Sequence, residues 1–237
     1  MVVIGTSAGG VDALMHIVRQ LPGDFPAPIC VVLHIPPNSP SLLAHILNRQ
    51  GPLPAKEAED GEFYRDGTIY IAPPDQHLLV AKDGRLRTVR GPRENRHRPS
   101  VDPLFRSAAA ALGAGVIGVI LTGALDDGTA GLIAVKKRGG IAIIQDPRDA
   151  LYPAMPSSAM EHVHADYVLP LANIPRQLTR IGSADRDWRS RTMTMMPDDE
   201  YDENAEDEEL DLERDEDENE DEDDDGRDRR RDPLRKI

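Results

Sequence analysis

Met1-Val-Val-Ile-Gly-Thr-Ser-Ala-Gly-Gly10 opens the chain and runs directly into Val11-Asp-Ala-Leu-Met-His-Ile-Val-Arg19. The β-branched residues at positions 2 to 4 are typical of a short buried strand, and apolar residues at positions 14, 17, 18 and 21 have the spacing of one helix face. Glycines at positions 5, 9 and 10 allow a sharp reversal between these elements, because glycine lacks a Cβ. The opening therefore predicts a strand, a tight turn and a helix, the first unit of an α/β fold.

The turn fits the pattern G-x-S-x-G over Gly5-Thr-Ser-Ala-Gly9. In that pattern a serine stands on a sharp strand-to-helix elbow beside the helix N-terminus, so Ser7 is the first candidate nucleophile. Two other interpretations remain open: a plain tight connection, or a loop that binds a phosphate at the helix N-terminus. The dinucleotide fingerprint G-x-G-x-x-G is not met, because Ser7 stands where its second glycine should be.

The negative charge of the chain is concentrated at its C-terminal end. Residues 184–237 contain 25 Asp and Glu against 10 Lys and Arg, whereas residues 1–183 contain 17 acidic and 18 basic residues. We expect one domain over residues 1–183 and a disordered acidic tail over residues 184–237, because the tail cannot bury enough apolar surface to offset its chain entropy. The tail is either a solvated segment or an electrostatic arm that competes for the basic loop of Arg93, Arg96 and Arg98.

Several classes of protein are disfavoured by composition. Cys30 is the single cysteine, so there is no disulfide framework and no thiolate metal cluster. We expect Cys30 to lie in the core, and we expect the protein to use no metal and no cofactor. No stretch approaches the roughly 18 apolar residues of a membrane helix, and no basic segment followed by an apolar one opens the chain. The domain carries almost no net charge. We expect a soluble cytoplasmic protein without membrane insertion or a nucleic-acid partner.

Apolar runs and helical patterns alternate along most of the domain. Strands are expected over residues 28–34, 115–122, 141–144 and 167–169. Helices are expected over residues 41–49, 104–112, 127–137 and 173–181, and from residue 156 onward. The first of these is expected to have Pro40 or Ser41 near its start. This alternation predicts right-handed crossovers and a parallel sheet whose strands are covered on both faces.

The middle of the domain has a different pattern. Residues 68–72 and 78–81 are short β-prone runs, and Asp83-Gly84 followed by alternating residues 85–89 indicates a hairpin. We interpret residues 60–92 as an excursion with antiparallel pairing at one side of the main sheet. A basic loop over residues 95–100 follows, and Asp102-Pro103 is expected to cap and begin the next helix.

Three polar residues follow predicted parallel strands: Ser7, His34, and Asp126 or Asp127. The carboxyl ends of parallel strands share one edge of the sheet, where ligands and catalytic groups gather. A serine, a histidine and an aspartate there are the parts of a nucleophile, its general base and the group that orients the base. Taken singly, His34 is also a common strand-end residue and Asp127 a common helix cap. The chain order of the three differs from that of the α/β-hydrolases, which disfavours membership of that class.

Several separated motifs follow one another in order between residues 2 and 181, namely Ile4-Gly-Thr-Ser-Ala-Gly-Gly10, Leu33-His-Ile-Pro-Pro37, Ala58-Glu-Asp-Gly61, Tyr70-Ile-Ala-Pro73, Asn95-Arg-His-Arg-Pro-Ser-Val-Asp102, Val119-Ile-Leu-Thr-Gly123 and Asp127-Gly128. On these motifs the chain closely resembles the catalytic domain of CheB-type protein-glutamate methylesterases of bacterial chemotaxis. The resemblance implies a doubly wound, mostly parallel sheet with helices on both faces. It also implies that Ser7 is the nucleophile, His34 the base and Asp127 the third member of the triad.

Further roles follow from the resemblance. The backbone N–H groups of Ala8 and Ala124 are the implied oxyanion donors. Arg96 and Arg98 are the residues we expect to bind the acidic receptor surface, unless Arg98 pairs with Asp102 or another carboxylate of the domain. The histidines at positions 77 and 97 are candidates for the border of the cleft, but the sequence assigns them no role.

The implied reaction is hydrolysis of glutamate γ-methyl esters on the helical cytoplasmic region of chemoreceptors, with release of methanol. Deamidation of glutamine at such sites is a second implied activity, and the implied partners are methyl-accepting chemotaxis receptors or a related signalling complex. One alternative is a regulatory scaffold with an esterase fold, or an esterase for another methyl ester outside chemotaxis. The other alternative is a nucleotide- or anion-binding module that uses the turn at residues 5–10.

Two departures from the family pattern stand out. Gly123-Ala124-Leu125 replaces a usual Gly-Met-Gly, so a positive φ at the third position would force a different loop and affect the Ala124 donor. The familiar form also carries a phosphorylated receiver domain ahead of the catalytic one. This chain begins at the first catalytic strand, so we expect no control by phosphorylation within it.

Overall fold

The computed structural model describes residues 1–35 and 42–184. The predicted helix start at residues 40–41 and the predicted disordered tail, apart from residue 184, lie outside the described residues. The strands are β1 Val2–Thr6, β2 Ile29–Leu33, β3 Ala55–Glu57, β4 Ile69–Ile71, β5 His77–Val80, β6 Leu86–Val89, β7 Ile117–Ile120, β8 Ile141–Gln145 and β9 Tyr167–Leu169. The helices are α1 Gly10–Gln20, α2 Leu43–Asn48, α3 Val101–Leu112, α4 Thr129–Lys137, α5 Ala154–His162 and α6 Ile174–Ala184, with short 3₁₀ helices at Gly113–Gly115 and Leu171–Asn173.

The main sheet has seven strands in the order β3-β4-β2-β1-β7-β8-β9. Every neighbouring pair in it is parallel, and β1 lies between β2 and β7. All residues of β1 and β2 are buried, as expected for continuous apolar strands covered on both faces. The predicted α/β fold with a parallel sheet is confirmed.

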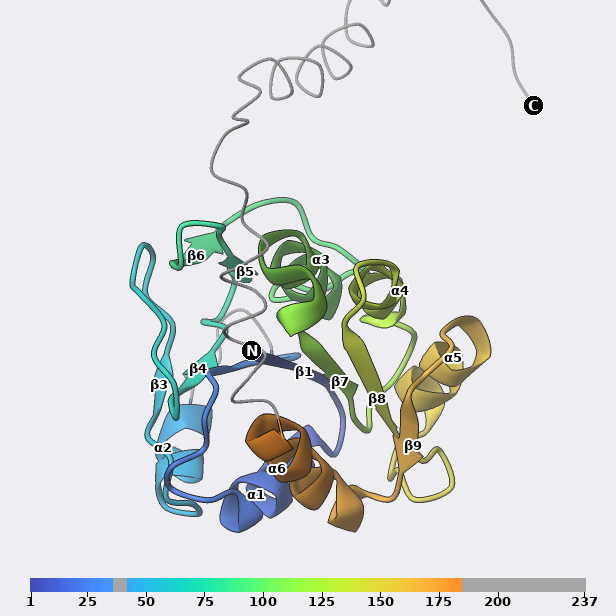
Figure 1. Ribbon diagram of the computed structural model, residues 1–237. Coiled ribbons are helices and arrows are strands. Elements are labelled where there is room, and N and C mark those ends of the chain that lie inside the picture. The colour runs from blue at the N-terminus through green and yellow to red at the C-terminus, as the bar shows by residue number, and fades with distance from the viewer. Residues whose placement is uncertain (36–41, 185–237) are drawn as a thin grey trace, which may run out of the picture. The chain divides into compact units, whose positions relative to one another are not determined.

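Helices cover both faces of the sheet because successive strand residues point to opposite sides. Val3 of β1 belongs to one hydrophobic cluster, with Phe105 of α3 and residues of α4 and α5. Ile4 belongs to the other, with Ile17 of α1 and residues of α2 and α6. Figure 1 shows α3 and α4 on one side of the central strands and α1 and α6 on the other. Each fully buried aliphatic or aromatic side chain contributes about 1.5–3 kcal/mol, so these two layers dominate the stability of the domain.

The excursion predicted over residues 60–92 is partly wrong. Residues 69–71 form β4, which lies inside the main sheet and pairs in parallel with β2 and β3. The antiparallel hairpin consists of β5 and β6, with Leu78 opposite Thr88. A short apolar run has the same pattern in both settings, so its strand partner is decided by tertiary packing.

The start predicted for α3 is also wrong. Ser100, not Asp102, occupies the N-cap position, and the helix begins at Val101. Pro103 is accommodated because the first N–H groups of a helix have no intrahelical acceptor. The next helix, α4, begins at Thr129 after Gly128, so Asp127 is not its N-cap and its side chain is available for other partners.

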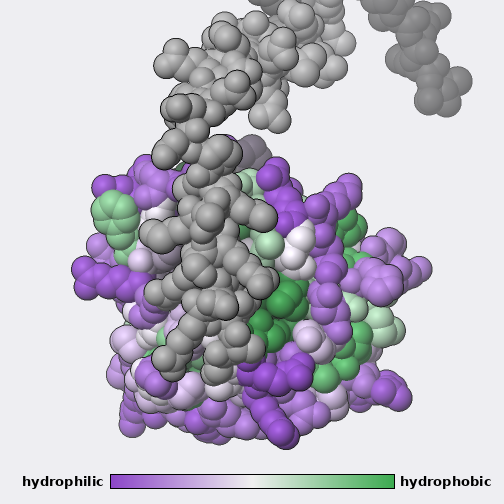
Figure 2. All heavy atoms as spheres, in the orientation of Figure 1, coloured by the Kyte–Doolittle hydropathy of each residue, from purple (hydrophilic) through white to green (hydrophobic). Residues whose placement is uncertain are grey.

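On the face seen in Figure 2, hydrophilic residues predominate and hydrophobic residues form small groups between them. Across residues 1–35 and 42–184, none of the helices combines the length and hydrophobicity that a bilayer-crossing helix requires.

Candidate active site

Ser7 follows β1 directly and stands in the turn that leads into α1. Its N–H donates to the carbonyl oxygen of Thr122 at 3.1 Å, and its own carbonyl accepts from the N–H of Gly10 at 2.9 Å. Gly9 caps α1 with a φ of 76°, a left-handed conformation that glycine adopts without steric cost. The turn therefore places the partly buried Ser7 at the carboxyl edge of the sheet, beside the end of β7.

His34 stands directly after β2, next to Ser7 in the register of the sheet. Its N–H donates to the carbonyl oxygen of Thr6 at 3.2 Å, which continues the pairing of Thr6 with Leu33. Neighbouring strands lie about 4.8 Å apart, so the residues that follow this pair are also neighbours. Ser7 and His34 therefore occupy neighbouring positions near the centre of the carboxyl edge.

Asp127 reaches His34 from the loop between β7 and α4. Its Oδ2 lies 2.6 Å from Nε2 of His34, and both side chains are largely buried. An ionised carboxylate only accepts hydrogen bonds, so Nε2 carries a hydrogen, and in the neutral form of an imidazole the other nitrogen keeps a lone pair. Nδ1 is buried and has no hydrogen-bond partner among the described residues. The His34 ring thus has one nitrogen bonded to Asp127 and the other without a partner among the described residues.

The Asp127 carboxylate is held by donors from the start of α3 and the loop before it. Ser100 Oγ lies 2.8 and 2.9 Å from its two oxygens, Asn95 Nδ2 donates at 2.8 Å, and the N–H groups of Val101 and Asp102 donate at 2.7 and 3.2 Å. Burial alone would raise the pKa of Asp127, but the hydrogen bonds from His34 and Val101, with the charge of His34 and the Asn95 amide, lower it to about 2. The carboxylate is therefore ionised at neutral pH.

A glycine in β1 allows α3 to approach the sheet closely enough for these contacts. A Cβ at Gly5 would overlap the side chain of Val101, so a larger residue would push the start of α3 away. The N-terminus of α3, with its exposed N–H groups and positive dipole, then faces the Asp127 carboxylate. Gly5 thereby serves the site through helix packing.

The loop before α3 adds a second histidine to the site. The His97 and His34 rings have centroids 3.8 Å apart and planes inclined by 50°. Burial and then the neighbouring His34 lower the pKa of His97, which favours the neutral ring. Sequence reasoning assigned no role to His97, Asn95 or Ser100, although all three belong to one motif directly before a helix start, which was the available signal.

Comparison with known proteins agrees with this geometry. The family model described as CheB methylesterase matches residues 2–178, which is most of the chain. The chain belongs to the CheB methylesterase family. It is 43% identical over 180 residues to a putative protein-glutamate methylesterase/protein-glutamine glutaminase of Leptospira interrogans, covering 76% of this chain and 93% of the relative. Membership of this family makes the protein a hydrolase of the methylesterase class.

Other relatives of the CheB methylesterase family differ in length. A protein-glutamate methylesterase/protein-glutamine glutaminase of Xanthomonas oryzae is 38% identical over 189 residues, and the chain spans about half of it, 52%. The crystal structure of the Thermotoga maritima CheB methylesterase catalytic domain matches with a TM-score of 0.73 and 43% identity, covering 76% of this chain and 97% of that one. The predicted resemblance to the CheB catalytic domain is therefore confirmed.

The loop after β7, where this chain departs from the expected family pattern, keeps a left-handed residue. Leu125 has a φ of 65° and is 51% exposed. The side chain thus occupies a conformation that usually favours glycine, and the loop accommodates it by directing Leu125 into solvent. Ala8 and Ala124 follow β1 and β7, which are paired neighbours, so their N–H groups belong to the same edge as Ser7.

The two arginines expected to bind substrate have different environments in this CheB methylesterase. Arg98 donates from Nε and Nη2 to Asp75 at 3.0 and 2.7 Å and also to the carbonyl oxygen of Gly91. The hydrogen bond from Arg98 is the main cause that lowers the pKa of Asp75. Arg96 is exposed and forms no ion pair within the described residues. The pairing of Arg98 with a domain carboxylate was the predicted alternative, and its partner is Asp75, not Asp102.

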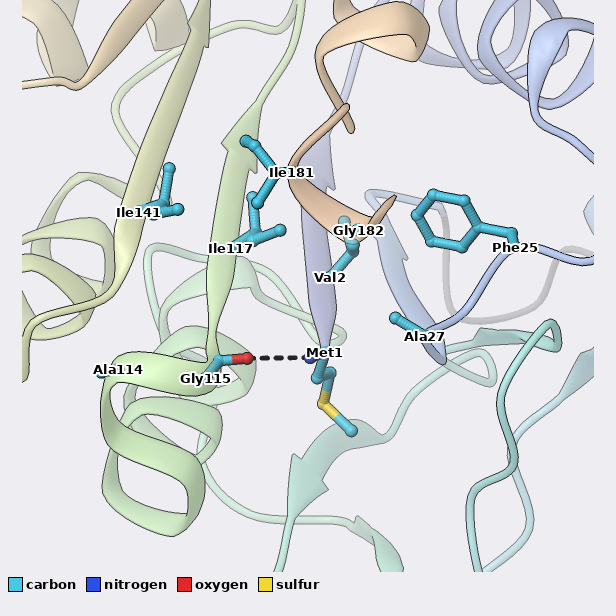
Figure 3. Close-up of a pocket in the computed structure, with 10 residues that line it drawn as sticks. All are labelled: Met1, Val2, Phe25, Ala27, Ala114, Gly115, Ile117, Ile141, Ile181 and Gly182. Carbon is cyan, nitrogen blue, oxygen red and sulfur yellow. Dashed lines mark hydrogen bonds between the residues drawn. The ribbon is translucent and has the colours of Figure 1, made fainter. Parts of the chain in front are cut away.

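Two cavities lie outside this arrangement of side chains. The one in Figure 3, of about 40 Å³, lies near Met1 at the amino edge of the sheet, where the Met1 ammonium donates to the Gly115 carbonyl at 2.8 Å. A second, of about 140 Å³, is lined by apolar residues that include Leu33 and Ile35 on either side of His34. Among the residues that the structure describes, no group of three His, Cys, Asp or Glu side chains is arranged to hold a metal ion.

Proposed function

We propose that this protein hydrolyses glutamate γ-methyl esters on cytoplasmic helices of methyl-accepting chemotaxis receptors or of a related signalling complex. The observation that carries the proposal is the bond of 2.6 Å between His34 and Asp127, formed at the carboxyl edge of the sheet where Ser7 and His34 follow the paired strands β1 and β2. Relatives named as protein-glutamate methylesterases support the choice of substrate. The reaction takes place in the cytoplasm, where such receptor helices lie.

The proposed mechanism has two steps. Ser7 Oγ attacks the ester carbonyl while Nδ1 of His34 takes the hydroxyl proton, and Asp127 stabilises the imidazolium that forms. His34 then gives that proton to the departing methoxide, so methanol and a glutamyl-Ser7 ester are the products of the first step. Water attacks this ester with His34 again as base, and glutamate and free Ser7 result. With glutamine as substrate the same steps release ammonia, which is the glutaminase activity in the relatives' names.

The negative charge on the tetrahedral oxygen needs donors at the same edge. We assign this role to the N–H groups of Ala8, next to Ser7 in the turn after β1, and of Ala124, in the loop after the neighbouring strand β7. Loss of one such donor typically costs about 10²- to 10³-fold in turnover. The left-handed Leu125 next to Ala124 supports this assignment, because the loop keeps the backbone reversal that a glycine would provide.

We assign Arg96 to the acidic surface of the receptor helix and give Arg98 the role of anchoring its loop. The exposed Arg96 is available to a partner, whereas Arg98 is engaged by Asp75 and Gly91. Replacing Arg96 by Ala should raise KM for a receptor fragment a few-fold, most strongly at low salt, and leave kcat unchanged. Arg138→Ala, an exposed arginine after α4 at the amino edge of the sheet, serves as control.

The decisive experiment measures methanol release from a methylated receptor cytoplasmic fragment by the full chain and by Ser7→Ala. We expect release by the full chain and none by the variant. Labelling with a fluorophosphonate, followed by mass spectrometry of peptides, should modify Ser7 and no other serine. A full chain that binds the receptor but releases no methanol would favour the regulatory scaffold, and release from another methyl ester only would favour an esterase outside chemotaxis.

A further inference from the structure

His77, the first residue of β5, is a buried histidine whose two ring nitrogens bind opposite ends of one loop. The residue is only 3% exposed. Nε2 lies 2.8 Å from the carbonyl oxygen of Pro92, and the N–H of Ser100 donates to Nδ1 at 3.2 Å. A carbonyl can only accept and an N–H can only donate, so Nε2 carries the hydrogen and Nδ1 the lone pair. The ring is neutral and both of its polar atoms are used.

The loop that His77 spans, residues 92–100, carries several of the groups that touch His34 and Asp127. Asn95 and Ser100 donate to the Asp127 carboxylate, and the His97 ring lies against the His34 ring. The loop therefore contacts both His34 and Asp127.

The backbone conformation of this loop is unfavourable without support from the rest of the structure. Asn95 and Arg96 have consecutive positive φ values of 48° and 68°, which non-glycine residues rarely adopt. Such residues persist where the surrounding structure constrains them. Arg98 fixes one point through Asp75 and Gly91, and His77 fixes the two ends.

We propose that neutral His77 is a positioning residue for the triad. By binding Pro92 and Ser100 it closes the loop at residues 92–100, which keeps Ser100 and Asn95 on Asp127 and His97 against His34. The hairpin of β5 and β6 then has a function, because it carries His77, which holds the two ends of the loop in place. The proposal rests on the proposed function for its kinetic test, but its spectroscopic test needs no substrate.

The first test compares His77→Leu with the unchanged full chain. Leu fills much of the same space but makes neither hydrogen bond, so we expect kcat for methanol release to fall about 10- to 100-fold with KM within about 2-fold, because a small displacement of catalytic groups costs this much. The downfield proton NMR signal of the His34–Asp127 hydrogen bond, assigned by its absence in Asp127→Asn, should broaden or disappear. His164→Leu, an exposed histidine at the other edge of the sheet, should change neither readout.

A second pair of variants separates positioning from simple burial. The amide oxygen of His77→Asn can still accept from Ser100, whereas His77→Gln can still donate to Pro92. Because Ser100 touches Asp127 directly, we expect Asn to retain more of the NMR signal and several-fold more kcat than Gln. The proposal is overturned if a folded His77→Leu keeps both kcat and the signal, or if Asn and Gln behave alike. A full chain that releases no methanol would refute the proposed function, while the NMR comparison would still decide the role of His77.

Discussion

Nε2 of His34 lies 2.6 Å from Oδ2 of Asp127, although 93 positions of sequence separate the two residues. This contact decides which nitrogen of His34 can act as a base. It uses Nε2 and leaves Nδ1 without a hydrogen-bond partner among the described residues. The orientation of a ring that follows β2 is thus set by the loop that follows β7, although β1 lies between these two strands in the sheet.

Asp127→Asn should reduce kcat by about 10³- to 10⁴-fold with little change in KM. The carboxylate accepts from five groups, whereas an amide offers one acceptor oxygen and two hydrogens of its own, so the ring would be held in the wrong tautomer. Steady-state methanol release provides the measurement. Asp126→Asn is the matched control, because that neighbouring carboxylate is exposed, and equal losses in both variants would contradict the assignment.

Ser100→Ala, compared with Ser7→Ala, should distinguish the roles of the two serines near the site. Ser100 is fully buried and its hydroxyl bonds both Asp127 oxygens, so its removal should lower the free energy of unfolding by about 1.5–3 kcal/mol and reduce turnover without abolishing it. Ser7→Ala should do the reverse, with no turnover and nearly unchanged stability. Urea unfolding and methanol release of both variants test this, and complete loss of turnover in Ser100→Ala with activity left in Ser7→Ala would exchange their roles.

Acid should weaken the fold partly through Asp127. Its folded-state pKa, about 2, lies below the ordinary value of 3.8, so the ionised group stabilises the fold above that ordinary value and loses this contribution as pH falls from about 5 to 2. The contribution is about 2 kcal/mol.

Comparison with Asp127→Asn isolates this group, because burial raises the pKa of Asp102 and gives that residue the opposite pH dependence. Urea unfolding between pH 2 and 6 should show the stability gap between wild type and Asp127→Asn narrowing toward low pH. A stability difference that stays constant over this range would show that the contacts in the folded protein do not lower the pKa of Asp127.

Leu125→Gly should stabilise the protein slightly or leave it unchanged. Removing the Cβ relieves the steric cost of the left-handed conformation, about 1–2 kcal/mol, whereas the flexibility of glycine in the unfolded chain costs about 0.5–1 kcal/mol. Turnover should be kept, since Leu125 is exposed and the loop retains its shape. Leu125→Val should lower both Tm and kcat, because a β-branched residue fits this conformation poorly. Thermal unfolding with a turnover assay checks both, and an inactive Leu125→Gly would show that the leucine side chain itself serves the reaction.

The sequence by itself determined the α/β class and the strand, turn and helix that carry Ser7. It also placed Ser7, His34 and Asp127 after parallel strands, and its ordered motifs indicated the CheB methylesterase family. These features are local, because apolar periodicity, glycine positions and strand ends are properties of short stretches of chain. Parallel strands also bring their carboxyl ends to one edge whatever their order in the sheet.

Only the tertiary structure decided which nitrogen of His34 is free, that Ser100 and not Asp102 caps α3, and that residues 69–71 join the main sheet. It also decided that Arg98 binds Asp75 and that His77 lies buried beneath the loop rather than at the border of a cleft. Each of these depends on contacts between elements far apart in sequence. A hydrogen-bonding side chain has several possible partners, and the packing of α3 and the hairpin against the sheet selects one.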